Sequence, residues 1–328
     1  MSVQELGRTS MAQNQGSDAI PIGGISGIEY DPISDDYLVV TDGLEGPGAG
    51  RIGRLRLRRE EDGGYRVRWL GSKALLPKDK GASPPVGEGA SVLDAEALRL
   101  TKDGDVLWSS EGDPKNGSGP GLYRSSLEDG RTTPLPLPPQ LERDPRAQRG
   151  PRDNRSFEGL WIDPQGNIWL GLEAPLIEDG PPPRPDKGAQ TQIMRIAKDG
   201  TLVQQWRYPL APITGQIPGR LADNGLSEIL GLGDGRFLVL ERSGAQQEDG
   251  RFLFTTRLFC AAPVPGTDRL EKWQLAQFGR GDGLERANFE GVTFGPATQD
   301  NGRSLVLAAD NNFEPGMPTW FVILAVDE

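Results

Sequence analysis

The chain has 328 residues, and Lys+Arg 36 against Asp+Glu 47 gives a formal net charge of −11. This length holds one large β domain or two ordinary domains, and the negative charge disfavours a nucleic-acid partner. The absence of histidine excludes a Ser-His-Asp triad, a histidine phosphatase and the usual histidine-containing zinc sites. The single cysteine, Cys260, excludes internal disulfides, and its apolar neighbours predict a buried structural thiol.

The N-terminal residues 1–20 are polar and lack the apolar centre of a secretion signal. We expect them to form a disordered tail, and residues 21–328 to form a single domain. No run approaches the ~20 apolar residues of a membrane helix, so we expect a soluble protein without membrane contact. Its location stays open: a periplasmic or secreted protein is one alternative, if a signal peptide has been removed.

From residue 26 onward a phrase recurs five times: a leading glutamate, a short strand, a turn, and a second strand that ends in another acid. The leading glutamates lie 67, 62, 70 and 62 residues apart. A period of this size with strands in every copy predicts a closed β-repeat such as a propeller. The five copies run over Ser26–Asp42, Asp94–Glu111, Phe157–Glu173, Leu226–Glu241 and Phe289–Asp310.

Short apolar runs alternate with turn dipeptides throughout the chain, and no segment of 12 or more residues keeps a helical pattern without Gly or Pro. The sequence therefore predicts an all-β protein, a single β-propeller with five blades. Six blades, one of them degenerate, is the alternative. The last copy has room for only three strands, so we expect residues near Ala19–Gly24 to supply the fourth strand and close the ring.

Three proline-rich inserts interrupt the repeats: Pro77–Pro85, Pro134–Pro151 and Pro175–Pro185. We expect them to be loops that project from one rim of the propeller, where binding sites are often built or covered. Rigid surface loops without a role are an equal alternative.

The leading glutamates open what should be the innermost strand of each blade, and equivalent positions in a closed ring face one axis. Uncompensated carboxylates within several Å of one another repel, unless protons or a cation neutralise them. Oxygen ligands without His or Cys select a hard ion, Ca²⁺ ahead of Mg²⁺ or Mn²⁺. The alternative is that each glutamate caps a backbone bend or pairs with an arginine. The predicted metal ligands are Glu29, Glu96, Glu158, Glu228 and Glu290, with Asp310 as an added ligand.

A second set of acids ends the neighbouring strands and can form an outer carboxylate shell, although pairing with nearby arginines is the stronger alternative for these. The set comprises Asp42, Glu111, Glu173, Glu241 and Asp310. A cation beside guanidinium groups is what phosphoester hydrolysis requires, and a carboxylate can take the proton of the attacking water. The predicted catalytic residues are Arg155, Arg242 and Glu173, and the two arginines would hold the phosphate.

At these motifs the chain resembles the phytase-like family, described as "esterase-like activity of phytase". The resemblance spans roughly residues 22–326, and Ala308-Ala309 depart from a Val-Ser pair that is common in the family. It implies a β-propeller and suggests phosphoester hydrolysis, and family members are often exported. The matching segments are 24–31 with Asp42, 154–160, 226–230, 238–242, 288–291 and 305–313.

The function favoured by these observations is a Ca²⁺-dependent phosphoester hydrolase, a phosphatase or phosphodiesterase that acts as a monomer on a small-molecule phosphoester. One alternative is a lactonase of the gluconolactonase type, whose blades also start with Glu-Gly and which binds one divalent ion at the axis. Another is a non-catalytic calcium-binding propeller that serves as a binding module, because propellers host many unrelated functions.

Overall fold

A computed structural model describes residues 1–13, 22–42, 50–77, 94–112, 119–142, 144, 146–298 and 302–327. The contact pattern divides the chain into two compact units. The first comprises Met1–Ser118, Leu122–Pro134 and Phe289–Glu328, and the second comprises Gly119–Gly121 and Leu135–Asn288. The expectation of one domain over residues 21–328 stays a prediction.

The first unit contains three blades, each an antiparallel meander in which strands close in sequence are neighbours in the sheet. Blade 1 comprises β2 (Ile25–Asp31), β3 (Asp36–Thr41), β4 (Arg51–Arg59) and β5 (Tyr65–Ala74). Blade 2 comprises β7 (Ala95–Leu100), β8 (Val106–Ser110), β9 (Gly121–Ser125) and β10 (Arg131–Pro134), with β6 (Leu76–Pro77) parallel to β10. Blade 5 comprises β19 (Asn288–Gly295), β20 (Arg303–Asp310), β21 (Thr319–Asp327) and β1 (Ser2–Met11).

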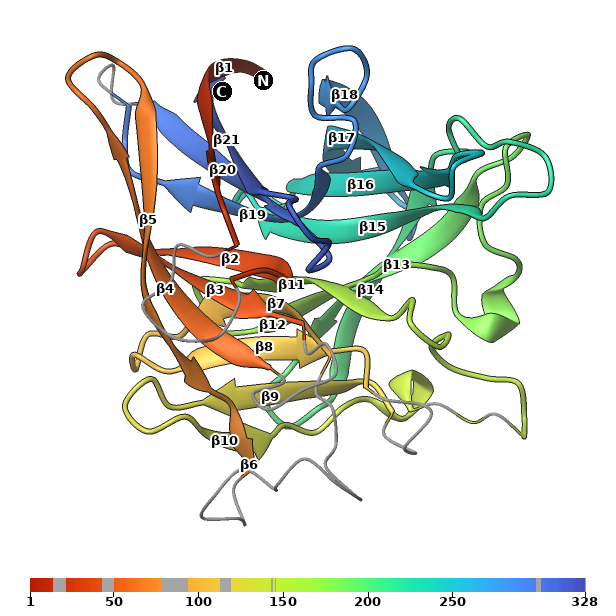
Figure 1. The fold of residues 1–328 in the computed structure, drawn as a ribbon. Helices are drawn as coiled ribbons and strands as arrows, with labels where there is room; N and C mark the ends of the chain where they lie inside the picture. Colours follow the sequence, from red (N-terminus) through yellow and green to blue (C-terminus); the bar gives the residue numbers. More distant parts are fainter. Residues whose placement is uncertain are drawn as a thin grey trace, which may run out of the picture. The chain divides into compact units, whose positions relative to one another are not determined.

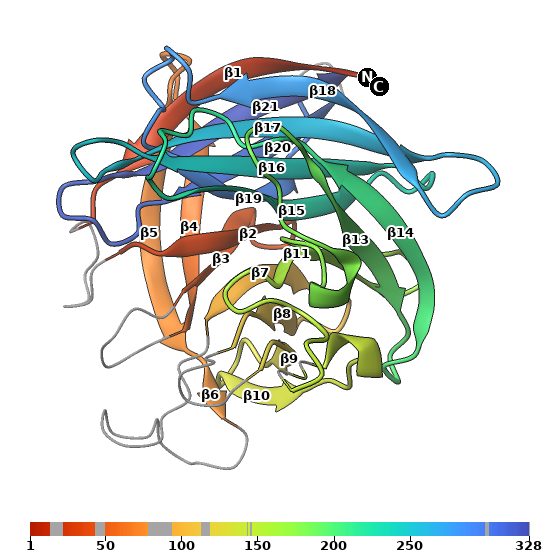
Figure 2. The ribbon, with the colours of Figure 1, turned by 90° about the vertical axis from the view of Figure 1, so that its right-hand side faces the viewer.

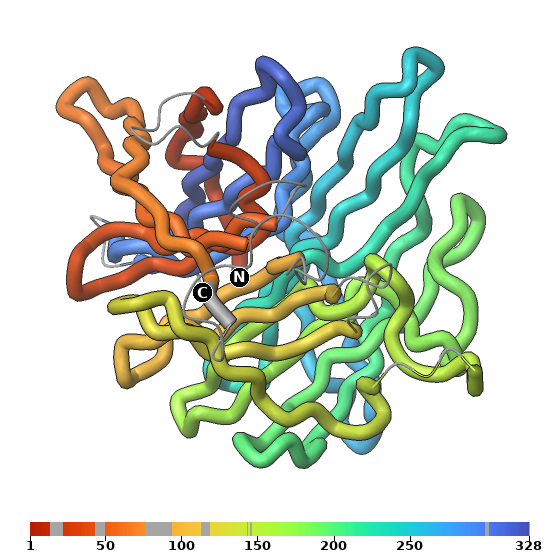
Figure 3. Tube along the Cα trace, turned by 60° about the horizontal axis from the view of Figure 1, so that its bottom comes forward, coloured from red at the N-terminus to blue at the C-terminus, as the bar shows by residue number. Residues whose placement is uncertain are grey.

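The second unit contains the other two blades, and the tube in Figure 3 follows their strands as successive hairpins. Blade 3 comprises β11 (Phe157–Ile162), β12 (Ile168–Leu172), β13 (Ala189–Ile196) and β14 (Leu202–Leu210). Blade 4 comprises β15 (Ala222–Gly231), β16 (Phe237–Gln246), β17 (Phe252–Pro263) and β18 (Leu270–Phe278), side by side in Figure 2. The predicted all-β class and the count of five blades are confirmed, and the six-bladed alternative is wrong.

The N-terminal residues form the outer strand of blade 5, where the two termini lie together (Figure 1). Strand β1 pairs antiparallel with β21 from Ser2, opposite Asp327, to Met11, opposite Thr319. The expected disordered tail is therefore wrong for Ser2–Met11, and this strand takes the place expected for residues near Ala19–Gly24. The sequence hides β1 because an outer strand buries little apolar surface. Of the rest of the expected tail, residues 14–20 lie outside the described residues.

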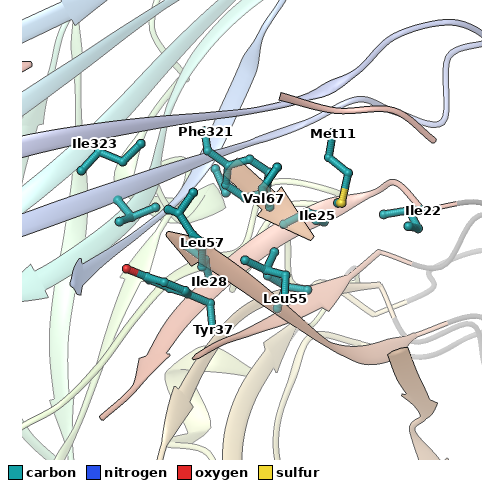
Figure 4. Close-up of a cluster of buried hydrophobic side chains, with 13 residues drawn as sticks. Met11, Ile22, Ile25, Ile28, Tyr37, Leu55, Leu57, Val67, Phe321 and Ile323 are labelled. Atoms are coloured by element: carbon teal, nitrogen blue, oxygen red, sulfur yellow. The ribbon is translucent and has the colours of Figure 1, made fainter. Parts of the chain in front are cut away.

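The cores of both units lie between neighbouring sheets. In the first unit, 13 buried residues from blades 1 and 5 pack together, with Tyr37 and Phe321 as the large members and Met11 brought in by β1 (Figure 4). In the second unit, Ile193 and Tyr208 of blade 3 pack with blade 4. Each fully buried side chain of this kind contributes roughly 1.5–3 kcal/mol. Cys260 is buried, as predicted.

Two of the proline-rich inserts are described, and they contact each other in the second unit. The insert Pro134–Pro151 contains the 3-10 turn η2 (Pro139–Leu141), and the insert Pro175–Pro185 contains η3 (Ile177–Asp179). The Gly150 amide donates to Glu178 Oε2 at 2.8 Å, and the Ile177 amide donates to the Gly150 carbonyl at 3.0 Å. The insert Pro77–Pro85 lies, after Pro77, outside the described residues. In the described ranges no helix is long and apolar enough to cross a membrane.

Candidate metal and phosphate sites

A β-bulge in the inner strand shows which residues of the five repeats are equivalent. In blade 3, Phe157 pairs with Leu172 and Gly159 pairs with Gly171, so Glu158 is the extra residue between them. The same shift lies between Ala95 and Leu98 in blade 2, and it includes Glu96. Such a bulge re-aims a side chain at the end of a strand. Glu96 and Glu158 therefore occupy one structural position.

In blades 1 and 4 this position holds a serine. The register shifts between Ile25 and Gly27 in blade 1, which makes Ser26 the extra residue. It shifts between Leu226 and Glu228 in blade 4, which makes Ser227 the extra residue. The prediction that every repeat delivers a glutamate at one position is therefore wrong for these two blades. The sequence motif aligns the five repeats by their glutamates. In the structure, equivalent backbone positions are those that follow the apolar residue before the bulge.

The second acidic position is defined by a repeated backbone hydrogen bond. The amides of Asp42, Glu111 and Glu173 each donate to a carbonyl at the start of the inner strand, over 2.8, 3.0 and 2.8 Å. In blade 4, Glu241 itself pairs with Leu226, so the residue that follows the paired strand position is Arg242. Three blades thus place an acid here and blade 4 places an arginine.

Six acidic residues gather in the first unit. Carboxylate oxygens of Asp94, Glu96 and Glu111 lie within 4.8 Å of one another. Burial, together with the negative charges of Asp310, Glu290 and Asp94, raises the pKa of Asp42 to about 9. The structure therefore brings the predicted ligands Glu96, Glu290 and Asp310 together with Asp42 and Glu111 of the outer set and with Asp94, which the sequence did not single out as a ligand. We call these residues the carboxylate cluster: Asp42, Asp94, Glu96, Glu111, Glu290 and Asp310.

Asp42 is the member of the carboxylate cluster with an orphaned oxygen. Its Oδ1 is buried and has no hydrogen-bond partner among the described residues. Gly24 lies against it: a Cβ at position 24 would come within 1.9 Å of this oxygen, and the backbone there has φ +60°. A glycine is therefore required beside Asp42. Asn311 holds this segment, because its Oδ1 accepts the Gly24 amide at 3.2 Å.

Glu29 belongs to the first unit but is bound to protein groups. Its Oε2 accepts a hydrogen bond from Thr293 Oγ1 at 3.0 Å and lies 3.7 Å from Arg99 Nη1. Burial raises the pKa of Glu29, and the positive charge of Arg99 opposes this. Arg99 is itself buried and donates to the carbonyls of Ile28 and Leu98. Glu29 therefore pairs with an arginine, which is one of the alternatives to a metal-ligand role.

Glu228, in the second unit, accepts backbone amides. Its side chain is completely buried, and its Oε1 accepts the Leu160 amide at 2.8 Å and the Ile229 amide at 2.9 Å. The carboxylate thus joins the inner strands of blades 3 and 4. Glu228 therefore caps backbone amides, the other alternative to a metal-ligand role.

The other predicted residues of the second unit form a group of acids and arginines. Carboxylate oxygens of Glu158 and Glu173 lie within 4.8 Å of each other, and both residues are buried. Arg242 Nη2 lies 3.4 Å from Glu173 Oε1, and Arg155 Nη2 lies 3.5 Å from Asp223 Oδ2. Burial is the largest cause that raises the pKa of Glu173, to about 7; the charges of Arg242 and Arg155 oppose this rise and that of Asp223 adds to it.

Asp223 is a site residue that the sequence motifs missed, because it precedes the fourth repeat by three positions. Glu241, which was named as an outer-shell acid, is saturated by other partners. It accepts Tyr208 Oη at 2.7 Å and the Ala211 amide at 3.0 Å, and it is paired with Lys272 Nζ. Its predicted pairing with a basic neighbour is present, with a lysine in place of an arginine.

Comparisons with known proteins bear on the fold and the family. The chain is similar to a thermostable family-43 glycoside hydrolase, at 11% identity, 97% of this chain, 93% of that chain and a TM-score of 0.53. It is also similar to an exo-β-1,3-galactanase from Clostridium thermocellum, at 11% identity, 99% of this chain, 63% of that chain and a TM-score of 0.54. At such identities the likeness concerns the fold alone. No curated protein sequence matches. A family model described as "Phytase-like: Esterase-like activity of phytase" matches residues 20–313.

Proposed function

The chain belongs to the phytase-like family, and we propose that it is a metal-dependent phosphoester hydrolase whose cation is held by the carboxylate cluster of the first unit. The observation that supports this most directly is the orphaned, buried oxygen of Asp42 among like charges. Such a carboxylate is costly in the folded protein unless a proton or a cation neutralises it. We propose Ca²⁺ as the ion, with Mg²⁺ or Mn²⁺ as alternatives.

The donor set of the carboxylate cluster fits a hard cation, since every side-chain donor is a carboxylate oxygen. We propose Glu96, Glu290 and Asp310 as ligands, with Asp42 and Glu111 added from the outer set and Asp94 added from the cluster itself. Glu29 and Glu228 are left out of this set because Arg99 and two backbone amides already hold them. Glu158 stays a separate candidate ligand in the second unit, where its carboxylate lies within 4.8 Å of that of Glu173.

A bound cation would neutralise phosphate oxygens and lower the pKa of a bound water. The catalytic roles of Arg155, Arg242 and Glu173 are proposed from contacts within the second unit. The Arg155 side chain is 36% exposed, and its ion pair among the described residues is the 3.5 Å contact with Asp223, so we propose that its guanidinium binds a phosphate. Arg242, at 14% exposed, stays on Glu173 and orients that carboxylate. With a pKa of about 7, Glu173 can accept or donate a proton near neutral pH.

The test is a hydrolysis assay on metal-stripped protein, with and without Ca²⁺. The substrates are p-nitrophenyl phosphate, a bis-ester of the same phenol, and a lactone. We expect Ca²⁺-dependent turnover of at least one phosphoester. Turnover of the lactone alone would support the lactonase alternative, and calcium binding without any turnover would support the binding module.

Two variants separate metal binding from phosphate binding. Glu290→Gln should weaken Ca²⁺ affinity and activity together, whereas Asp103→Asn, an exposed acid of the same unit, should change neither. Arg155→Ala should leave Ca²⁺ affinity intact and lower kcat/KM by on the order of 10²–10³-fold, the range for loss of one electrostatic stabiliser. Full activity in Arg155→Ala, or normal Ca²⁺ binding in Glu290→Gln, would show that these roles are misassigned.

A further inference from the structure

A second cavity lies within the second unit, at the end of the blades away from Glu158 and Glu173. Those acids stand at the start of β11 and just after β12, whereas the cavity is reached at the end of β11 and the start of β12. It measures about 240 Å³ and lies between the sheets of blades 3 and 4. The proposed hydrolase function uses none of its residues. Its walls include Trp161, Trp169, Trp206, Phe237, Arg195 and Gln204.

One wall of the cavity is a row of side chains that crosses all four strands of blade 3. Trp161 pairs with Trp169, Trp169 with Arg195, and Arg195 with Gln204. Because residues directly opposite in a sheet point to the same face, these four side chains share one face. Trp206 lies two positions after Gln204 and joins them. The wall is therefore aromatic at both ends and polar between.

The aromatic rings are fixed by their packing. Phe237 of blade 4 meets Trp169 at a centroid distance of 5.0 Å and Trp161 at 6.1 Å, both edge to face. Trp161 covers Gly231, where a Cβ would come within 2.3 Å of the indole ring. Trp169 Nε1 is held by Asp163 Oδ2 at 3.3 Å. Such rings present rigid apolar faces to a ligand at little cost in conformational entropy.

Arg195 is the arginine of the cavity wall that lies against the tryptophans. Its guanidinium carbon lies 5.6 Å from the centroid of the Trp169 ring, and its Nε is buried without a hydrogen-bond partner. Among the described residues it forms no ion pair. The other arginine of the lining, Arg236, is paired with Asp234. Asp163 also lines the cavity, and its oxygens accept the Gln165 and Asn167 amides and the Asn167 side chain. A bound anion would give the buried Nε of Arg195 the hydrogen-bond acceptor that it lacks among the described residues.

We propose that this cavity binds an acidic saccharide, with a pyranose ring against the tryptophans and its carboxylate on Arg195. The apolar face of a sugar ring matches an indole face, and a guanidinium matches a carboxylate through two parallel hydrogen bonds. Side-chain amides of Gln165 and Gln204 line the same cavity and suit hydroxyl groups. These amides favour a saccharide over a flat aromatic acid, which has no hydroxyls to satisfy them.

The test is ligand-observed saturation-transfer NMR on the full chain in the presence of chelator, so that no cation on the carboxylate cluster contributes. D-glucuronate is the probe. Methyl glucoside has the sugar ring without the carboxylate, acetate has the carboxylate without a ring, and benzoate has a carboxylate on a flat aromatic ring. We expect saturable binding of glucuronate, and binding of the other three at least about tenfold weaker, the effect of one charge-assisted contact. No saturable binding of glucuronate, or equal binding of acetate or benzoate, would overturn the proposal.

Variants connect the binding to this cavity. Arg195→Gln should reduce glucuronate affinity to that of methyl glucoside, Arg195→Lys should restore part of it, and Trp206→Leu should weaken both sugars at least about tenfold. The matched controls are Arg207→Gln and Trp273→Leu, exposed residues of the same unit outside the cavity, which should bind like the wild type. Wild-type affinity in both Arg195→Gln and Trp206→Leu, each shown by melting to be folded, would contradict the proposal.

Discussion

Asp42 is the residue whose ionisation most directly tests the electrostatics of the carboxylate cluster. Its pKa is about 9 in the folded protein and 3.8 ordinarily, so the folded state holds a proton that the unfolded state releases as the pH rises above about 4. The metal-free protein should therefore lose stability between about pH 4 and pH 9. Above pH 9, or with a cation in place, the group is ionised in both states.

We predict that Asp42→Asn stabilises the metal-free protein at pH 8 by on the order of 1–3 kcal/mol, the scale of an uncompensated buried group. The gain should shrink toward pH 4, where the wild-type carboxyl is protonated in the folded state and increasingly so in the unfolded one. Urea unfolding in chelator at both pH values measures it, with Asp103→Asn as the exposed control. A gain that is the same at both pH values would mean that the effect is not ionisation.

Glu228 gives the opposite prediction, because its contacts are backbone amides of two blades. Glu228→Ala should cost about 1–3 kcal/mol or more, since it leaves the buried Leu160 and Ile229 amides without their acceptor. Ca²⁺ affinity of the folded variant should be unchanged, which calorimetric titration would determine. A large loss of Ca²⁺ affinity without loss of stability would return Glu228 to the ligand set.

The sequence was sufficient to find the acids but not to choose among them. Glu96, Glu290 and Asp310 were named from the motif and do gather in one unit. The same motif predicts Glu29 and Glu228 as ligands. Glu29 lies three residues after the bulge residue Ser26, and Glu228 lies one residue after the bulge residue Ser227, so both side chains have other partners. A bulge is a backbone register shift, and the sequence marks it weakly: a glycine stands two positions after the apolar residue in blades 1 and 3, but Glu228 stands there in blade 4.

At the scale of the element, β1 shows how a strand can escape detection. Its polar composition resembled a tail, because the outer strand of a blade has few apolar contacts to make. The backbone pairing with β21 holds it in place, and only Met11, at its end, is fully buried. The second strands of the blades, by contrast, are largely buried and apolar, and they begin within the five repeats found in the sequence.

We predict that Met11→Ala destabilises the protein by about 2–5 kcal/mol, the usual cost of removing a buried large side chain. Leu6→Ala, on the same strand but exposed, should cost less than about 0.5 kcal/mol. Thermal or urea unfolding of the two variants measures the difference. If the two substitutions had equal small effects, β1 would not be docked in solution.

At the scale of the whole molecule, the net charge of −11 and the carboxylate cluster make the folded protein a natural receptor for cations. The five-blade count followed from the repeat period alone, because each repeat must supply one sheet. Which blade carries Glu or Ser at the bulge, and which carries an acid or Arg at the second acidic position, could not follow from the period. That choice depends on local register.

The last prediction concerns the effect of the cation on the folding equilibrium. Ca²⁺ that binds only the folded state should stabilise it by RT ln(1 + [L]/Kd), about 2.7 kcal/mol at a hundredfold excess over Kd. Melting in chelator and in millimolar Ca²⁺ measures this, and hydrogen exchange should place the added protection at the strand ends of Asp42, Glu111 and Asp310. Glu290→Gln should reduce the shift in melting temperature, and Asp103→Asn should not. An unchanged midpoint, in protein shown to be metal-free at the start, would count against a cation on the carboxylate cluster, because neutralising its mutual repulsion cannot leave the folded state equally stable.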